Sequence, residues 1–300
     1  MDMTQNKCCR HGANLRRRRR RRRKILRFII FSCSIMAVAV FVAVGSRMIR
    51  SGDGRTNKYD VEAGNNTYDN VVIENSKISE KNKIQNNQSM LDDIMNSTQY
   101  PKQLKDLALK NEEALEFVYD YPAEHVKEHT IDLTEEASMD SVPLFVQWDK
   151  RWGYEKYSGN FFAASGCGPT TLSMVVVYLT HNREASPIAV AKYSKEAGYS
   201  VDGSGSSWTL ISEGCMHYGV KAKAVALDES RMKAELDEGH PIVVNVGPGD
   251  FTDTGHFMVI TGYDDEGFSI NDPNSIEKSG KRWLFKNISS QIRAVWSMYV

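Results

Sequence analysis

The sequence predicts an α+β domain over residues 141–300, preceded by a single transmembrane helix. Two observations favour this organisation. In the C-terminal half, helix-forming segments come first and short strands follow, which is the order of an α+β domain rather than of a doubly wound sheet. Near the N-terminus, the 19 residues 28–46 include no charged side chain. The composition, with 41% hydrophobic residues and only five Cys, excludes a collagen, a disulfide-stapled mini-protein and a wholly disordered chain.

Residues 1–27 predict a basic cytoplasmic tail. They hold twelve basic side chains and one acidic side chain, whereas residues 28–300 hold 26 basic and 37 acidic side chains. The formal net charge of zero therefore conceals a separation of charge. Eight consecutive arginines, Arg16 to Arg23, lie just before the uncharged stretch. Since Lys and Arg are retained on the cytoplasmic side, we expect the N-terminus inside the cell and residues 47–300 outside.

The uncharged stretch 28–46 predicts a retained anchor in the cell membrane, because about 20 apolar residues cross a bilayer. The nearest alternative is a cleaved signal peptide, whose apolar region is shorter, about 7–15 residues. An arginine block also occurs in nucleic-acid-binding patches. Beside a membrane span, however, topology and attraction to anionic lipids explain the arginines. We therefore expect one membrane-spanning helix and no nucleic-acid partner.

Residues 47–88 predict a flexible stalk, and residues 89–140 predict a small helical segment. The stalk is rich in Asn, Ser, Gly, Asp and Lys, and its few apolar residues follow no period. Such a segment cannot bury enough surface to offset the entropy of the chain. In the next segment, apolar residues recur at helical spacing between Pro101 and Pro122. We expect one or two helices there, packed as a cap on the domain that follows.

Residues 141–300 predict four helices and then three strands. Pro169 suits the first turn of an apolar helix, and Gly198 and Gly219 suit the ends of the next two. The last two strands form a hairpin through the turn at 264–267. The expected helices cover 168–180, 187–197, 207–218 and 228–238, and the expected strands cover 242–246, 256–263 and 268–271.

Cys167 is a candidate nucleophile because it lies directly before the predicted helix at 168–180. Unpaired N–H groups and the helix dipole favour an anion at this place and lower the pKa of a thiol. The flanking Gly166 and Gly168 permit close approach of a substrate backbone. The alternative interpretation is a small buried apolar residue, which is the usual role of a free cysteine.

His256 and Asp272 are candidates for the base and for the residue that orients it. A thiol, an imidazole and a carboxylate on neighbouring strands form the set used in nucleophilic catalysis. A simple hairpin places Asp272 opposite Val259 rather than His256, so the arrangement requires a bulge near Gly262 or a longer loop. Asn271 is the alternative orienting residue.

Gln147 is a candidate oxyanion donor. Its amide, together with the Cys167 backbone N–H, could hold the oxyanion of an acyl intermediate. Taken alone, Gln147 is better interpreted as an exposed residue of a strand. We expect Cys215 to be a buried free thiol rather than the partner of Cys167 in a disulfide, which would abolish thiol chemistry. His181, His217 and His240 lack partners at metal-ligand spacing, so we expect no metal and no cofactor.

Four short motifs, taken in order, resemble the bacteriocin-processing-type cysteine peptidases of the papain-like clan, and in particular their stand-alone relatives. The likeness covers about residues 142–298, and its motifs are 142–149, 166–171, 255–257 and 271–275. It implies a papain-like cysteine peptidase fold, in which a central helix carrying the thiol packs on an antiparallel sheet. It also implies the roles of nucleophile, base, orienting residue and oxyanion donor for Cys167, His256, Asp272 and Gln147.

The sequence therefore predicts a membrane-anchored, extracytoplasmic cysteine peptidase of a bacterial cell surface, with a peptide or protein as substrate. The type members of the family are cytosolic domains that are fused to an export transporter and cut leader peptides. Because the predicted topology puts this domain outside, leader processing is not expected. Two alternatives use the same fold: a catalytically silent binding or adhesion module, and a cell-wall peptide hydrolase or transamidase. A thiol pKa near 8.5 would indicate the silent module.

Overall fold

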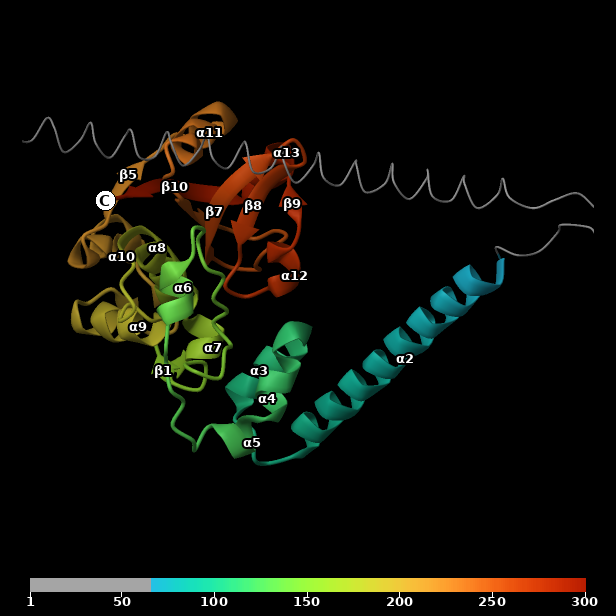
Figure 1. Cartoon of the computed structure of the whole chain (residues 1–300). Helices are drawn as coiled ribbons and strands as arrows, with labels where there is room; N and C mark the ends of the chain where they lie inside the picture. The colour runs from blue at the N-terminus through green and yellow to red at the C-terminus, as the bar shows by residue number, and fades with distance from the viewer. Residues whose placement is uncertain (1–65) are drawn as a thin grey trace, which may run out of the picture. The chain divides into compact units, whose positions relative to one another are not determined.

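The computed structural model describes residues 66–300, with side chains from residue 80 onward (Figure 1). Residues 71–300 form one compact unit. The predicted basic tail, the predicted membrane span and the beginning of the predicted stalk lie outside the described residues. Among the residues that are described, no helix combines the length and the apolar character needed to cross a membrane.

The first part of the predicted α+β domain is mainly helical. The apolar helix α8 (Cys167–Thr180) and the helix α9 (Pro187–Glu196) form where the sequence predicts them. The predicted third helix is split at Glu213 into α10 (Thr209–Ser212) and η2 (Gly214–Tyr218). The break lies next to Gly214, and glycine has low helix propensity. The short elements around them are β1 (Lys156–Tyr157), β2 (Asn160–Phe161), α7 (Phe162–Ser165), β3 (Ser200–Val201) and β4 (Gly205–Ser206).

The second part is built on a six-stranded antiparallel sheet with the strand order β5-β10-β6-β7-β8-β9. The sequence predicts the three strands at positions three to five of this order, and not the other three. The strands are β5 (Lys221–Ala224), β6 (Ile242–Val246), β7 (His256–Asp264), β8 (Gly267–Asn271), β9 (Arg282–Trp283) and β10 (Ile292–Tyr299). The helices between them are α11 (Glu229–Asp237), α12 (Ile276–Ser279), α13 (Phe285–Ile288) and η3 (Ser289–Gln291).

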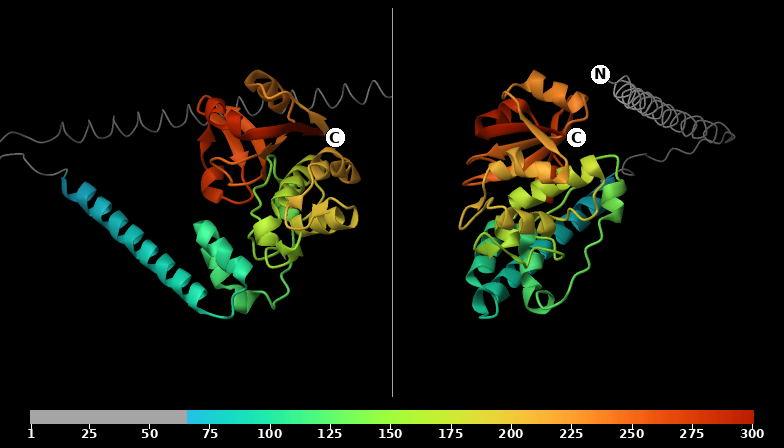
Figure 2. Two further views of the ribbon diagram at one scale, coloured as in Figure 1. Left: turned by 180° about the vertical axis from the view of Figure 1, so that it is seen from behind. Right: turned by 90° about the vertical axis from the view of Figure 1, so that its left-hand side faces the viewer.

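The sheet lies between two helical layers, as the right-hand view in Figure 2 shows. Alternate residues of its central strands point to opposite faces. On one face, Val243 and Val259 belong to the core cluster that includes the buried side chains of α8. On the other face, Val244 and Ile260 pack in the cluster that includes Met232 of α11. This arrangement confirms the predicted α+β class and places the first turn of α8 against the sheet.

The helical segment before this domain forms as predicted between Pro101 and Pro122. Its buried side chains, among them Leu104 and Val118, form a third cluster with Phe161 of the following domain, so the segment packs on that domain. The helices are α3 (Lys102–Lys110), η1 (Glu112–Ala114), α4 (Leu115–Tyr119), α5 (Tyr121–Glu124) and, farther along the chain, α6 (Thr134–Ser138).

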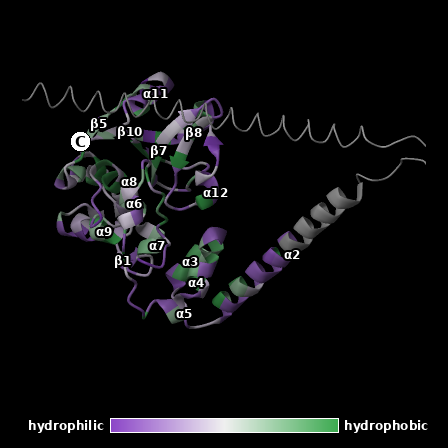
Figure 3. Ribbon diagram, viewed as in Figure 1, coloured by the Kyte–Doolittle hydropathy of each residue, from purple (hydrophilic) through white to green (hydrophobic). Residues whose placement is uncertain are grey.

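The helix α2 (Asn66–Asn96) corrects the prediction of a flexible stalk over 47–88, because the stalk is helical from residue 66 onward. The helix contains neither Gly nor Pro, so its sequence does not break it. Composition missed it because most of its described side chains are hydrophilic (Figure 3) and give it no apolar face. Its last turns pack on the helices that follow, through Met90, Leu91 and Ile94.

Candidate active site

Cys167 is the first residue of α8, and Gly166 is the residue before the helix. A Cβ at Gly166 would lie 2.6 Å from a ring carbon of Phe162, and a Cβ at Gly168 would lie 2.5 Å from the Ser206 hydroxyl. Both glycines are thus required for packing inside the protein, which differs from the substrate-access role predicted from the sequence. Their packing fixes the place at which the helix, and with it the thiol, begins.

The Cys167 side chain is half-buried and free, and three groups stabilise its anionic form. Burial raises the pKa of the thiol. Hydrogen bonding with His256, the positive charge of that ring, and the backbone N–H groups of Phe257 and Gly168 lower it. The net effect is a pKa below the ordinary value for a thiol. The position at the start of a helix acts in the same direction.

His256, the first residue of β7, is bonded on one side to a carboxylate. Its Nε2 atom lies 2.7 Å from Oδ1 of Asp272, the residue that follows β8, and both side chains are buried. Because Nε2 is used in this way, Nδ1 is the ring nitrogen left for the Cys167 thiol. The structure therefore brings Cys167, His256 and Asp272 together in a chain from sulfur to imidazole to carboxylate.

A bulge in the β7–β8 hairpin brings Asp272 toward His256. The register shifts by one residue between Ile260 and Gly262, so that Val259 pairs with Asn271 instead of Asp272. This is one of the two arrangements that the sequence required. Asp272 is then the diagonal neighbour of His256 along the paired strands, a separation that longer side chains can bridge.

The electrostatic environment of His256 favours the protonated ring. Burial lowers the pKa of this histidine, because it disfavours the charged form. The charge and the hydrogen bond of Asp272, followed by the interaction with Cys167, outweigh burial and raise the pKa to about 10. A raised imidazole pKa beside a lowered thiol pKa favours a thiolate–imidazolium pair at neutral pH.

Asn271, the alternative orienting residue, does not contact the imidazole. Its Nδ2 atom donates hydrogen bonds to the carbonyl oxygens of Val142 and Pro143, at 3.1 and 3.0 Å. It thereby fastens the end of β8 to the chain segment that leads into Gln147. Of the two candidates, Asp272 is the one placed beside His256.

Gln147 is buried close to the beginning of α8. Its Nε2 atom donates to the carbonyl oxygen of Ala163 at 2.7 Å, and its backbone N–H donates to the carbonyl oxygen of Pro273 at 2.7 Å. The second N–H of the side-chain amide remains for another acceptor. Cys167 is the first helical residue, so its N–H lacks a partner within the helix. These two donors are the pair that the sequence predicts for an oxyanion.

Sequence reasoning missed two groups that act on the sulfur, the backbone N–H groups of Phe257 and Gly168. Backbone donors belong to every residue type except proline, so nothing in the sequence marks them. Cys215 is fully buried and free, as predicted. The structure therefore contains no disulfide between the two cysteines of the described residues.

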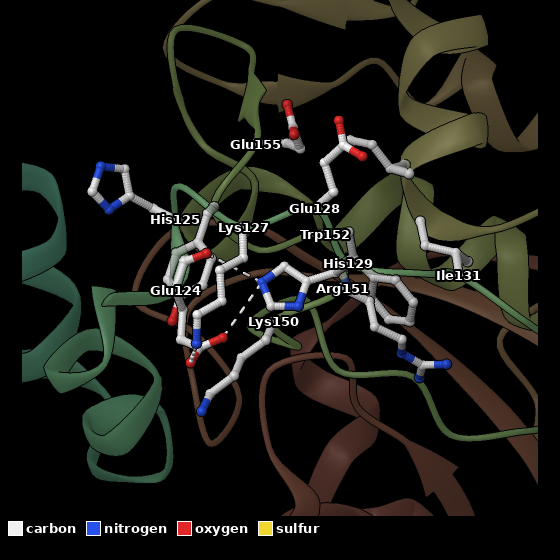
Figure 4. Close-up of a pocket in the computed structure, with 12 residues that line it drawn as sticks. Glu124, His125, Lys127, Glu128, His129, Ile131, Lys150, Arg151, Trp152 and Glu155 are labelled. Atoms are coloured by element: carbon white, nitrogen blue, oxygen red, sulfur yellow. Dashed lines mark hydrogen bonds and ion pairs between the residues drawn. The ribbon is translucent and has the colours of Figure 1, made fainter. Parts of the chain in front are cut away.

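A pocket of about 370 Å³ lies elsewhere, between the chain segments 124–131 and 150–155 (Figure 4). None of the four predicted site residues lines it. Its basic side chains are already paired, Lys127 with Glu124, Lys150 with Asp120 and Arg151 with carboxylates that include Asp149. We therefore place the candidate active site at the start of α8 and not in this pocket.

Comparison with known families identifies the family of the domain. The model of the peptidase C39-like family matches residues 139–300, and all four predicted site residues lie within this range. The chain belongs to the peptidase C39-like family. This membership confirms the resemblance found in the sequence, and it makes a cysteine peptidase the coarse functional class of the domain.

Two solved structures are each similar to about half of the chain. One is the peptidase domain of Streptococcus ComA, described as a bifunctional ABC transporter of a quorum-sensing pathway, with 19% identity and a TM-score of 0.38. The other is a putative C39-like peptidase from Bacillus anthracis, with 16% identity and a TM-score of 0.34. Each comparison covers 53% of this chain and 96% or 95% of the other. Among curated proteins, none matches this chain.

Proposed function

We propose that the protein is a cysteine peptidase that cleaves peptide bonds through a thioester acyl-enzyme, with Cys167 as nucleophile. The observation that carries the proposal is the hydrogen-bonded chain from the Cys167 thiol through His256 to Asp272, within a domain of the peptidase C39-like family. A thiolate held beside an imidazolium is the reactive form that this chemistry needs.

In the acylation step, the Cys167 sulfur attacks the carbonyl carbon of the scissile bond, and the carbonyl oxygen becomes an oxyanion. The Cys167 N–H and the free N–H of the Gln147 amide stabilise that charge. His256 then donates its proton to the nitrogen of the leaving amine, and the C–N bond breaks. The products are the amine and a thioester on Cys167.

In the deacylation step, His256 is neutral and accepts a proton from a water molecule that attacks the thioester carbon. The C–S bond breaks, the acid product leaves, and the thiolate is restored beside the imidazolium. Asp272 acts through His256: it keeps the ring in one orientation and stabilises its charged form.

Labelling of two cysteine variants tests the assignment of the nucleophile. We expect Cys167→Ala to lose both peptide hydrolysis and labelling by an electrophilic peptide probe at pH 6. Cys215→Ala is the matched control, because burial raises the pKa of that thiol to about 11 and keeps it protonated. It should retain labelling and hydrolysis.

Equal labelling of the Cys167→Ala protein would refute the assignment. Labelling of Cys167 without turnover of any peptide would instead favour the silent binding module on the same fold. Product analysis then sharpens the substrate class. Unstructured protein and cell-wall peptides are incubated with the enzyme in parallel, and new termini or new amide bonds are identified by mass spectrometry.

We further propose that residues 28–46 anchor the enzyme in the cell membrane with the peptidase domain outside. The proposal rests on the absence of charge in this stretch and on the eight arginines before it. Protease added to intact cells should remove the peptidase domain and spare an N-terminal tag. Recovery of the full-length domain in a soluble fraction would contradict the anchor.

A further inference from the structure

The turn that carries Asp272 is held by residues from a distant part of the chain. Asn111, between α3 and η1, donates from Nδ2 to the carbonyl oxygen of Asn274 at 2.9 Å and to its Oδ1 atom at 3.1 Å. Glu113, in η1, accepts from the backbone N–H groups of Ile276 and Glu277 at 2.7 and 3.1 Å. It also accepts from the Ser275 hydroxyl. These contacts join positions that are more than 160 residues apart in the sequence.

The held turn is itself bonded to the orienting carboxylate. The backbone N–H of Asn274 donates to Oδ1 of Asp272 at 2.8 Å, the same oxygen that contacts Nε2 of His256. The backbone N–H of Ser275 donates to the carbonyl oxygen of Asp272 at 3.2 Å. Asn111 and Glu113 thus hold the turn from Asn274 to Glu277, and the first residue of that turn contacts the Asp272 carboxylate through its N–H.

We propose that Asn111 and Glu113 are positioning residues of the active site, which hold Asp272 against His256 through the turn 273–277. The inference rests on the proposed peptidase function. Both residues precede the region 139–300 that matches the family, so these contacts with the turn come from the helical segment and not from the matched domain. The helical segment accordingly supports the active site as well as packing on the domain.

The chemistry of Glu113 suits this role. A single carboxylate satisfies two backbone donors and one hydroxyl at the start of α12, where a short helix leaves its first N–H groups unpaired. The side chain is only partly exposed, so water does not replace all of these bonds on truncation. Without it, the turn gains freedom and Asp272 loses its fixed distance to the imidazole.

The chain offers a matched control in the adjacent Glu112. That carboxylate is exposed and accepts from Nδ2 of Asn87 on α2, away from the Asp272 turn. The full-length protein is compared as wild type, Glu113→Ala, Glu113→Gln, Asn111→Ala and Glu112→Ala. The measurements are kcat and KM for a peptide substrate, the rate of Cys167 alkylation by iodoacetamide as a function of pH, and the melting temperature.

We expect Glu113→Ala to lower kcat about tenfold with KM nearly unchanged, which is typical of losing a supporting contact behind a reacting group. The charged groups that face His256 are Asp272 and Cys167. When Asp272 moves away, the imidazolium is less stable and stabilises the thiolate less. The pH at which Cys167 alkylation is half-maximal should therefore rise by about one unit, which corresponds to a change of about tenfold in the thiol ionisation constant. Glu113→Gln and Asn111→Ala should show smaller shifts in the same direction, and Glu112→Ala none.

A double variant separates positioning from simple loss of stability. If Glu113 acts through Asp272, Glu113→Ala should have no further effect on kcat in an Asp272→Asn background. The inference would be overturned if Glu113→Gln and Asn111→Ala lower the melting temperature but keep the wild-type kcat and the wild-type alkylation profile. These two variants provide the test even if Glu113→Ala fails to fold. That result leaves the peptidase proposal intact, because the labelling and hydrolysis measurements on Cys167→Ala test that proposal separately.

Discussion

The two cysteines of the described domain show opposite chemistry in neighbouring regions of one fold. Cys167 begins α8, half-exposed, with an imidazole and two backbone N–H groups on its sulfur, and its pKa is lowered. Cys215 lies in η2 with no exposed surface, and burial raises its pKa to about 11. Both are surrounded by the same core cluster. The difference teaches that burial raises the pKa of a thiol, and that hydrogen-bond donors and a neighbouring positive charge outweigh burial at Cys167 but not at Cys215.

Removal of the His256 imidazole should have the largest effect on the difference in reactivity between Cys167 and Cys215. We expect His256→Ala to lower kcat/KM about 1,000-fold, because the proton donor and the partner of the thiolate are both lost. Alkylation of Cys167 at pH 6 should fall toward that of an ordinary thiol. His240→Ala is the control, since the His240 ring contacts Glu235 and Tyr299 rather than Cys167 or Asp272, and its kinetics should match the wild type. An equal loss in the control would point to misfolding.

Gln147→Ala separates stabilisation of the oxyanion from formation of the thiolate. We expect kcat to fall about 100-fold, as is typical when one oxyanion donor is removed. Alkylation by iodoacetamide forms no oxyanion, so its rate and pH dependence should stay at the wild-type level. If alkylation slows in parallel with hydrolysis, the residue supports the thiolate or the fold, and the oxyanion assignment is wrong.

The pH dependence of hydrolysis should reflect both shifted groups. The lowered pKa of Cys167 keeps the thiolate present as pH falls below the usual thiol range, so the acid limb of the profile should lie on the acid side of that range. The raised pKa of His256 keeps the leaving-group proton available until the pH rises through about 10. Beyond that point, activity should drop about tenfold per pH unit. A profile centred on an ordinary histidine, with activity lost above pH 7, would contradict the ion pair.

The smallest effect is expected at Cys215. Cys215→Ala should leave kcat/KM unchanged and destabilise the domain by about 1–2 kcal/mol, because it removes one buried atom from a packed core. Cys215→Ser should destabilise it more, since it buries a hydroxyl where a weakly polar sulfur lay. Chemical denaturation followed by fluorescence measures both. Loss of activity in a stable Cys215→Ala protein would show that this thiol contributes to the reaction.

Local features of the site could be predicted from the sequence, because local rules produce them. The start of α8 at Cys167 follows from Pro169 and the apolar run behind it, and the β7–β8 hairpin follows from its turn residues. Counting residues from the turn shows that a regular hairpin cannot bring Asp272 beside His256, so the sequence indicates an irregularity such as a bulge near Gly262. The counting left two solutions open, a bulge or a longer loop, and only the register in the structure distinguishes them.

Features that depend on distant partners could not be predicted. The contacts of Asn111 and Glu113 with the Asp272 turn join segments with no common local pattern. The strand β10 was missed because it is specified by pairing with β5 and β6, far away in the sequence, more than by its own alternation. The helix α2 was missed because its described side chains are mostly hydrophilic and show no helical period of apolar residues.

The position of β10 has a consequence for biosynthesis. Residues 292–299 form the strand between β5 and β6, and β6 in turn pairs with β7, which carries His256. We expect a nascent polypeptide to leave this sheet unfinished until residue 299 has emerged from the ribosome. During translation Cys167 would then lack its imidazole partner, and the incomplete chain could not cleave other proteins in the cell. Released chains that end before residue 292 and the full-length protein should accordingly differ in their reaction with iodoacetamide.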